Sequence, residues 1–202
     1  HDATYFNVSR VLELAINDGK WLHDDVQMGP HTGYLKDFKS FDEVLNAFDI
    51  QMKYFVDLMI SSINTIEQVH KEYKPLPYLS LLIDNCITNG RDVTNGGAKY
   101  NLTGPQALAL GTAADSLCTI RQLVFDEKSV SAEELISALK ANWEGYETLY
   151  RLVNSDKVHH YGNDDDYADE LAKFVFDTYC KYVEKRPNVR GGHYAPGVYS
   201  VA

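Results

Sequence analysis

Two stretches of this sequence place imidazole and carboxylate groups close together. His1 stands beside Asp2, a pairing that can do acid–base work, although it lies at a chain end. His159 and His160 precede an acidic run at 164–166, which raises the question of a metal site. Adjacent histidines on a helix point about 100° apart, however, so a shared ion is awkward. The aspartates are better explained as a helix start, where the helix dipole favours carboxylates. We therefore expect no metal site.

The stretch GRDVTNGGAKYN contains the adjacent pair Gly96 and Gly97. A phosphate loop would need Lys-Ser or Lys-Thr at the head of the next helix, and the sequence does not supply it. The dinucleotide-binding pattern needs three glycines at fixed positions between a strand and a helix, and it is missing as well. The pair therefore predicts a tight turn before a short strand at Ala98–Asn101. Backbone that lines a ligand site is the alternative.

Two tyrosines, Tyr194 and Tyr199, stand in the glycine-rich segment GGHYAPGVYS. The aromatic and β-branched residues around them predict an extended strand over Tyr194–Ala202. Tyrosines in such a strand usually pack in the core. The alternative is a strand that lines the mouth of a barrel, where a tyrosine hydroxyl can donate to a polar substrate.

The composition narrows the classes of function. The chain carries a net charge of −10 and has a pI near 5.1, so its surface should repel phosphate groups. We therefore expect no nucleic acid as a partner. We also expect no membrane as a partner, because no apolar run approaches the roughly 20 residues that cross a bilayer. The cysteines Cys86, Cys118 and Cys180 lie far apart in apolar helical patterns. They indicate reduced core thiols in a cytosolic protein.

Helical patterns dominate the chain. Apolar positions from Phe6 to Ala15 recur at helical spacing, which predicts a helix that begins within a few residues of the start. Ser40 and Glu43 form a capping-box pattern, in which the Ser40 hydroxyl accepts from the Glu43 amide. A helix of about 30 residues with one apolar face should follow. That face is expected to comprise Phe41, Leu45, Phe48, Met52, Phe55, Met59, Ile63 and Ile66.

Further signals complete the expected elements. A short apolar helix ends at Gly90, and Pro105 suits the first turn of another helix. The capping-box pattern recurs at Ser131 and starts a helix that continues, with a bend at Gly145, toward Leu152. The last helix follows the acidic run and precedes the expected terminal strand. Together these patterns predict a helix-rich α/β fold in which residues 1–202 form a single segment.

Four longer motifs in register give the sequence a resemblance to a known family. They are HDATYFNVSRVLELAINDG, GRDVTNGGAKYNLTGPQ, YGNDDDYADELA and RPNVRGGHYAPGVYSV. Their order and spacing resemble those of the glycyl radical enzymes, most of all the dehydratases and decarboxylases related to pyruvate formate-lyase. The resemblance covers essentially the whole chain. It implies part of an α/β barrel, in which the Gly-Gly-Ala stretch leads into a barrel strand and the next helix packs outside.

The sequence departs from that family where the radical chemistry takes place. The family carries a thiyl-forming cysteine and a nearby glutamate in a Gly-Cys-Val-Glu-Pro motif, and its radical glycine lies near the carboxyl terminus. Neither motif occurs in this chain. The resemblance therefore implies an internal segment between the two loops, with no catalytic residue and no cofactor of its own, and inactive by itself. The rival is a non-catalytic helical interaction module that keeps the barrel scaffold.

For a parent protein, the resemblance implies an anaerobic, cytoplasmic lyase that acts on a small polar organic molecule. Dehydration is the first expectation, and decarboxylation or another C–C or C–X cleavage is the second. A separate activating enzyme with an iron–sulfur cluster and S-adenosylmethionine would install the glycyl radical. The residues implied as substrate-binding are Asp2, which would hydrogen-bond a substrate hydroxyl, and Tyr199, which would line the pocket or donate to the leaving group. Strand edges left open outside a closed barrel also predict a homo-oligomer.

Overall fold

The computed structural model describes residues 2–199, and for Asp2 it describes the backbone alone. The chain forms two compact units, and each is treated by itself. We call them the sheet unit, which comprises residues 2–6, 56–107 and 179–199, and the helix unit, which comprises residues 7–55 and 108–178.

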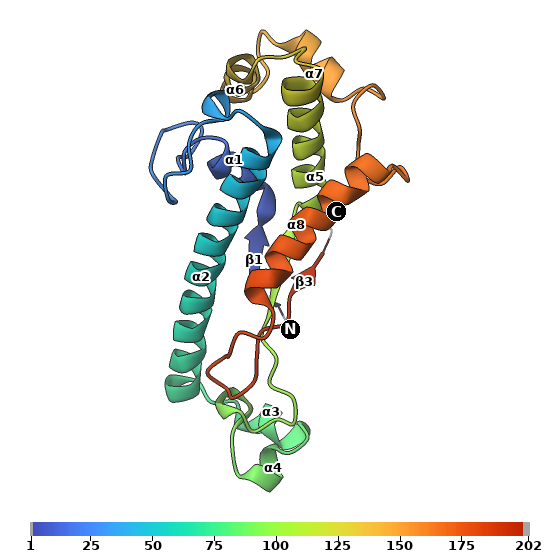
Figure 1. The fold of residues 1–202 in the computed structure, drawn as a ribbon. Helices are drawn as coiled ribbons and strands as arrows, with labels where there is room; N and C mark the ends of the chain where they lie inside the picture. The colour runs from blue at the N-terminus through green and yellow to red at the C-terminus, as the bar shows by residue number, and fades with distance from the viewer. Residues whose placement is uncertain (1, 200–202) are drawn as a thin grey trace. The chain divides into compact units, whose positions relative to one another are not determined.

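Helices account for most of the described residues (Figure 1). The α-helices are α1 (Val8–Ala15), α2 (Phe41–Tyr73), α3 (Pro77–Leu82), α4 (Cys86–Asn89), α5 (Leu110–Thr119), α6 (Ala132–Lys140), α7 (Glu147–Val153) and α8 (Asp166–Val183). The 3-10 turns lie at Leu35–Asp37 and Val93–Asn95, and a π-helix follows α5 at Ile120–Asp126. The strands are β1 (Asp2–Asn7), β2 (Gly104–Leu108) and β3 (Gly197–Val198). These elements confirm the predicted helix-rich α/β fold.

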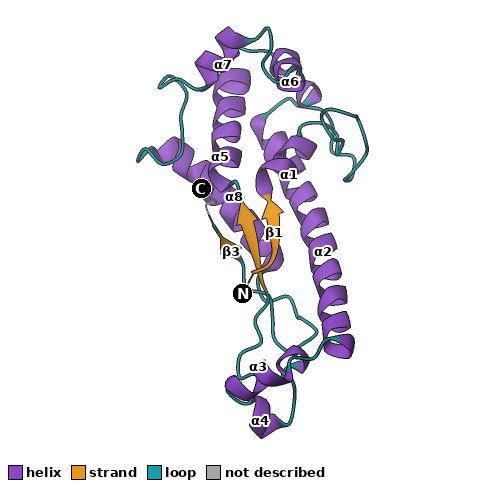
Figure 2. Cartoon of the chain, turned by 180° about the vertical axis from the view of Figure 1, so that it is seen from behind, coloured by secondary structure: helices purple, strands orange, loops and turns teal. Residues whose placement is uncertain are grey.

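The strands form a three-stranded sheet with the order β1-β2-β3. Strands β2 and β3 run parallel, with Gln106 opposite Gly197 and Ala107 opposite Val198. In Figure 2 the arrow beside β1, which is β2 in this strand order, points the same way as β1. All three strands therefore run in one direction, as in the parallel sheets of α/β folds.

Two buried tyrosines hold the core of the sheet unit. The Tyr179 ring stacks on Phe6 with 5.6 Å between the ring centroids, and the Tyr179 hydroxyl donates to the Pro105 carbonyl at 3.0 Å. The Tyr194 hydroxyl donates to Asn64 Oδ1 at 2.9 Å. Burial raises the pKa of Tyr194 to about 12, so its hydroxyl stays a neutral donor. The packing role predicted for Tyr194 is confirmed, since its side chain is fully buried.

Helix α2 has the predicted length and most of the predicted apolar face. It spans 33 residues. Phe48, Met52, Met59 and Ile63 from the predicted face are buried, whereas Ile66 is 54% exposed. The apolar stripe therefore reaches from the first turns of α2 to Ile63, and the last turns of the helix lie outside it.

The two capping-box patterns have different outcomes. At α2, the Glu43 N–H donates to the Ser40 carbonyl at 3.2 Å, and the Glu43 carboxylate accepts from the Lys39 N–H at 2.9 Å. The Ser40 hydroxyl is therefore not the predicted cap, because the Glu43 amide uses the backbone instead. At α6, the Ser131 hydroxyl accepts from the Glu134 N–H at 3.1 Å, which confirms the prediction there.

Helix α6 ends earlier than the sequence predicts. It stops at Lys140, and Asn142 and Trp143 then take positive φ values of 49° and 69°. Left-handed residues cannot continue a right-handed helix. The helix predicted to run toward Leu152 is therefore two helices, α6 and α7, and the break precedes the bend that we placed near Gly145.

The main errors of the sequence-based prediction concern strands that were predicted as helix. Phe6 belongs to strand β1, and helix α1 begins only at Val8. Pro105 lies in strand β2 rather than in the first turn of a helix. Within sheets, proline is confined largely to edge strands, strand starts and bulges, and Pro105 is the second residue of β2. Helix α5 begins at Leu110, after Ala109 turns the chain with a φ of 61°.

The apolar stretch before Gly90 forms two helices instead of one. Asn85, with a φ of 76°, separates α3 from α4, and Gly90 closes α4 in the left-handed conformation, as predicted. The strand predicted at Ala98–Asn101 is a loop, in which the Asn101 side-chain amide donates to the Ala98 carbonyl at 2.9 Å.

The terminal strand is shorter than predicted within the described residues. Of the range Tyr194–Ala202, only Gly197 and Val198 form strand β3, and Tyr194 makes one isolated parallel bridge with Thr103. Residues 200–202 lie outside the described residues. Pro196 interrupts the backbone donors between the bridge and the strand.

Large apolar side chains remain exposed in the sheet unit, at the carboxyl end of α2, on α3 and α4 and in the loop before β2. They are Ile66, Val69, Tyr73, Tyr78, Leu81, Leu82, Ile87 and Tyr100. Patches of this kind favour association, and the homo-oligomer stays a prediction. Over residues 2–199, no helix combines the length and the apolar character that a membrane span requires.

Candidate functional site

The two residues predicted to bind substrate occupy opposite ends of the parallel sheet. Asp2 is the first residue of β1, and Tyr199 directly follows β3. Because the strands run in one direction, the start of β1 and the end of β3 lie at different ends of the sheet. The backbone of this segment does not by itself bring the two positions together.

The backbone of Tyr199 is hydrogen-bonded to strand β2, and its side chain is exposed. Its N–H donates to the Ala107 carbonyl at 3.1 Å, which continues the pairing of β3 with β2. The residue is 59% exposed. A phenol held by a paired backbone and open to the surroundings can donate a hydrogen bond to a polar ligand.

Gln106 is a candidate that the sequence did not single out. It faces Gly197 across the β2–β3 pairing and is only 5% exposed. Its Nε2 donates to the Gly104 carbonyl at 3.3 Å, while its Oε1 is buried without a hydrogen-bond partner. A Cβ at position 197 would lie 2.4 Å from that oxygen. Gly197 is therefore required by close packing against Gln106.

A buried polar cluster lies where β2 begins. Its centre is Thr103, which is 2% exposed. The Thr103 hydroxyl donates to Glu67 Oε1 at 2.7 Å and accepts from Asn188 Nδ2 and Arg190 Nη2, each at 2.9 Å. Arg190 also pairs with Glu67 Oε1 at 3.2 Å. The cluster ties α2, the start of β2 and the loop before β3 together inside the sheet unit.

Glycines let the backbones in this region approach closely. A Cβ at Gly97 would lie 1.9 Å from the Arg91 carbonyl oxygen, and Gly96 combines a φ of 74° with a site 2.2 Å from the Arg190 carbonyl oxygen. A Cβ at Gly192 would lie 1.9 Å from the Asn101 carbonyl oxygen. The pair Gly96-Gly97 therefore makes a tight turn, as predicted, and it also packs against the loop before β3.

The histidines near the acidic run belong to the helix unit and serve the start of α8. His159 Nδ1 lies 2.6 Å from Asp165 Oδ2, and the His159 ring stacks on Tyr167 with 4.2 Å between centroids. The hydrogen bond from His159 lowers the pKa of Asp165. Asp165 also accepts from the Tyr167 N–H at 3.0 Å, which is the predicted helix start. Among the described residues, no group of three or more His, Cys, Asp or Glu side chains is arranged to hold a metal ion.

The three cysteines are buried or partly buried. Cys118 is fully buried, and burial followed by the charge of Asp115 raises its pKa to about 12. Cys86 is also buried, and Cys180 is partly buried. The prediction of core thiols is confirmed for Cys86 and Cys118.

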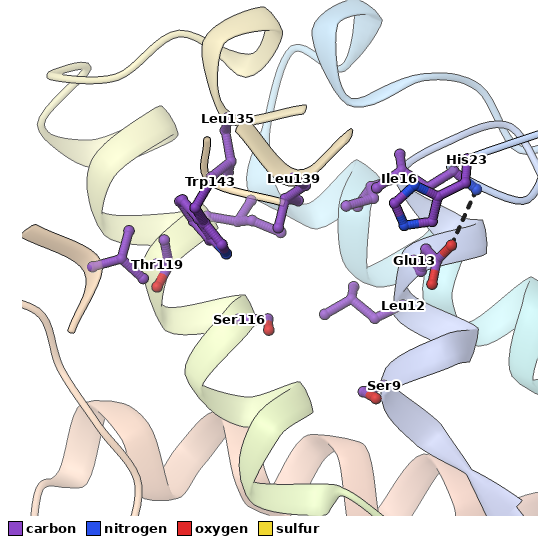
Figure 3. Close-up of a pocket in the computed structure, with 13 residues that line it drawn as sticks. Ser9, Leu12, Glu13, Ile16, His23, Ser116, Thr119, Leu135, Leu139 and Trp143 are labelled. Carbon is purple, nitrogen blue, oxygen red and sulfur yellow. Dashed lines mark hydrogen bonds between the residues drawn. The ribbon is translucent and has the colours of Figure 1, made fainter. Parts of the chain in front are cut away.

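The helix unit contains a cavity of about 260 Å³ between α1, α5 and α6. Figure 3 shows Leu12 on one side of it, Ser116 on the opposite side, and Leu139 and Trp143 near its far end. Its only carboxylate, from Glu13, already accepts from the Leu22 N–H at 3.0 Å. The lining is otherwise apolar or neutral apart from one imidazole, so the cavity presents no converging groups for catalysis.

A family model and a known relative match the chain along its whole length. The family model described as pyruvate formate lyase-like matches residues 1–202. The chain is 53% identical over 201 residues to the (2S)-3-sulfopropanediol dehydratase of Klebsiella oxytoca, with 100% of this chain and 24% of the relative covered.

Two solved structures have closely similar folds. The hydroxyproline dehydratase of Clostridioides difficile, with trans-4-hydroxy-L-proline bound, has a TM-score of 0.91 and 40% identity. The glycerol-bound B12-independent glycerol dehydratase of Clostridium butyricum has a TM-score of 0.89 and 38% identity. Each match covers 96% of this chain and 24% of the other. The chain thus spans about a quarter of the length of the relatives it matches.

Proposed function

Because the chain belongs to the pyruvate formate lyase-like family, the glycyl radical enzymes, we propose that its 202 residues form part of a lyase that removes water from a small hydroxylated organic molecule. The observation that carries this proposal is the 53% identity to a diol dehydratase along the whole chain. In the proposal, residues 1–202 are one segment of a larger barrel domain, and the activity belongs to the longer protein.

The residues of this chain would bind and orient the substrate. Asp2 would accept a hydrogen bond from a substrate hydroxyl at the start of β1. Tyr199 would donate from its phenol to the leaving hydroxyl or line the pocket. Its exposed side chain and its paired backbone support this role. A substrate contact at both residues requires side chains to bridge the length of the sheet or further polypeptide to shape the pocket between them.

The radical group itself would supply hydrogen-atom abstraction from a C–H bond. None of the three cysteines in this chain stands in the family's Cys-loop motif. No step of the reaction is therefore assigned to a thiol of this chain. In the proposal, a separate iron–sulfur activating enzyme that uses S-adenosylmethionine installs the radical, and the protein works in the cytoplasm under anoxic conditions.

Electron paramagnetic resonance tests the proposal. The protein at its natural length, treated anaerobically with an activating enzyme, is expected to develop the doublet of a glycyl radical. The 202-residue chain treated in the same way should give none, because it lacks the radical-glycine motif. A doublet on the 202-residue chain, or no radical in the longer protein, would contradict the proposal. The second result would favour the non-catalytic interaction module.

The binding roles have their own test in the activated protein. Tyr199→Phe removes one hydroxyl and is expected to lower kcat/KM about tenfold, the value of one hydrogen bond to a polar group that is then left unpaired. Tyr100→Phe is the matched control, since Tyr100 is 77% exposed on a loop of the same unit. Equal kinetics for the two variants would remove Tyr199 from the site.

A further inference from the structure

Strand β3 is too short to define its own pairing register. It contains two residues, and Pro196, which has no N–H, directly precedes it. In a parallel pair, a slip of one residue moves every side chain to the other face of the sheet. The position of Tyr199 therefore depends on contacts outside the strand itself.

Those contacts converge on Thr103. Its N–H donates to the His193 carbonyl at 3.1 Å, and its carbonyl accepts from the Ala195 N–H at 2.9 Å. These two bonds set the parallel bridge three residues before the register pair Gln106 and Gly197. Any slip of β3 would have to break them.

The Thr103 side chain adds hydrogen bonds to the same contact between the start of β2 and the segment before β3. A hydroxyl has one donor and two acceptor sites, and all three are used here, with Glu67, Asn188 and Arg190 as partners. Two of those partners also hold neighbouring backbone. Asn188 donates to the Asn101 carbonyl at 2.7 Å, and Arg190 donates to the Leu102 carbonyl at 2.8 Å.

We propose that the Thr103 hydroxyl, through Glu67, Asn188 and Arg190, is the positioning group that fixes the register of β3 and so sets the face on which Tyr199 stands. Thr103 and its partners do not touch a substrate in this assignment. They act through Tyr199, and to that extent the proposal depends on the proposed function.

Two substitutions separate the hydroxyl from the shape of the side chain. Thr103→Val keeps the volume and leaves three buried polar partners short of a hydrogen bond. Thr103→Ser keeps the hydroxyl and is the matched control. The net contribution of a hydrogen bond to a charged group corresponds to about a tenfold change, or more, in the equilibrium between the native and a slipped register of β3.

Disulfide trapping in the protein at its natural length reads the register directly. Ala107 and Val198 are direct partners, and neighbouring strands lie about 4.8 Å apart, which is within disulfide range. Cysteines at these two positions should crosslink under mild oxidation in the Thr103→Ser background. In the Thr103→Val background the ratio of crosslinked to uncrosslinked protein should fall about tenfold. Peptide mapping separates this bond from Cys86, Cys118 and Cys180. An equal crosslink in both backgrounds would overturn the proposal.

Hydrogen exchange covers the case in which the double-cysteine variant fails to fold. The Tyr199 and Ala195 amides are bonded to β2, at Ala107 and Thr103. Both should exchange about tenfold faster in Thr103→Val than in Thr103→Ser. Unchanged exchange at both amides would also overturn the proposal.

Kinetics in the activated protein distinguish positioning from general stability. If Thr103 acts through Tyr199, Thr103→Val should lower kcat/KM in the wild-type background but add little to Tyr199→Phe. Full additivity would contradict action through Tyr199. The crosslinking result stands without any activity, so a failure of the proposed function and a failure of this inference are told apart.

Discussion

The loops around the sheet and the helices of the helix unit are held by different kinds of contact. In the sheet unit, the Thr103 hydroxyl forms hydrogen bonds with Glu67 and Arg190, which lie 36 and 87 positions away in sequence. Glycines there let backbone segments that are distant in sequence approach closely. In the helix unit, the bonds that start the helices are local, such as Ser131 to Glu134 and Asp165 to Tyr167. Local caps are individually worth about 1 kcal/mol, whereas a backbone clash in a packed region has no easy relief. The two regions should therefore differ in their sensitivity to small substitutions.

The largest difference is expected between two glycines. Gly97→Ala places a methyl group 1.9 Å from the Arg91 carbonyl oxygen, so the loop must move, at a cost of about 3 kcal/mol or more. Gly111→Ala, in helix α5, meets only the Tyr161 ring at 3.6 Å and should stabilise the helix by about 0.5–1 kcal/mol. Urea unfolding of both variants measures the contrast. Two equal midpoints would remove the distinction between the regions.

A smaller effect is expected from Asp92, which holds the loop that leads to the glycine pair. Its carboxylate accepts from the Leu76 N–H at 3.0 Å, the Ser80 hydroxyl at 2.7 Å and the Thr94 N–H at 2.9 Å. Burial alone would raise the pKa of Asp92, but these bonds outweigh it and lower the pKa to about 2.

The sign of the pH dependence follows from that depressed pKa. The carboxylate stabilises the fold above the unfolded-state pKa of about 3.9, and this contribution is lost as the pH falls toward the folded-state pKa. Urea unfolding between pH 6 and pH 2 should show a loss of about 1–2 kcal/mol that is missing in Asp92→Asn. A pH profile shared by wild type and variant would show that Asp92 is not the group involved.

The smallest contrast concerns the two serines of the capping-box patterns. Ser131→Ala removes a cap that the Glu134 N–H uses and should destabilise the protein by about 1 kcal/mol. Ser40→Ala should change stability by less than about 0.5 kcal/mol, because the Glu43 N–H donates to the Ser40 backbone carbonyl. Thermal unfolding of the two variants measures this difference, and the reverse order would mean that the Ser40 hydroxyl is the cap after all.

The parts of the fold that could be predicted from the sequence are the long periodic elements and the local helix caps. Helix α2 repeats its apolar spacing over many turns, and Gly90 and Ser131 carry local signals whose chemistry acts within a few residues. Strand β2 was mistaken for helix because its residues continue an apolar run into α5. The turn between them falls at Ala109, which has no turn signature.

The site was less accessible to sequence reasoning than the fold. Tyr199 and Asp2 came from the family resemblance and not from spacing. Thr103 and Gln106 carry no local motif, and their importance depends on partners that the fold brings from far along the chain. Glycine was the one usable signal, because Gly96 and Gly97 marked a turn, but their packing against the Arg190 backbone is a tertiary fact.

Product analysis in the activated protein at its natural length tests the central claim most directly. The protein is incubated anaerobically with a small vicinal diol, after its glycyl radical has been verified. Loss of one water molecule per turnover, with formation of the corresponding aldehyde, is the result that dehydration predicts. A full radical signal with no aldehyde from glycerol or from (2S)-3-sulfopropanediol, or release of carbon dioxide instead, would contradict the proposed dehydration.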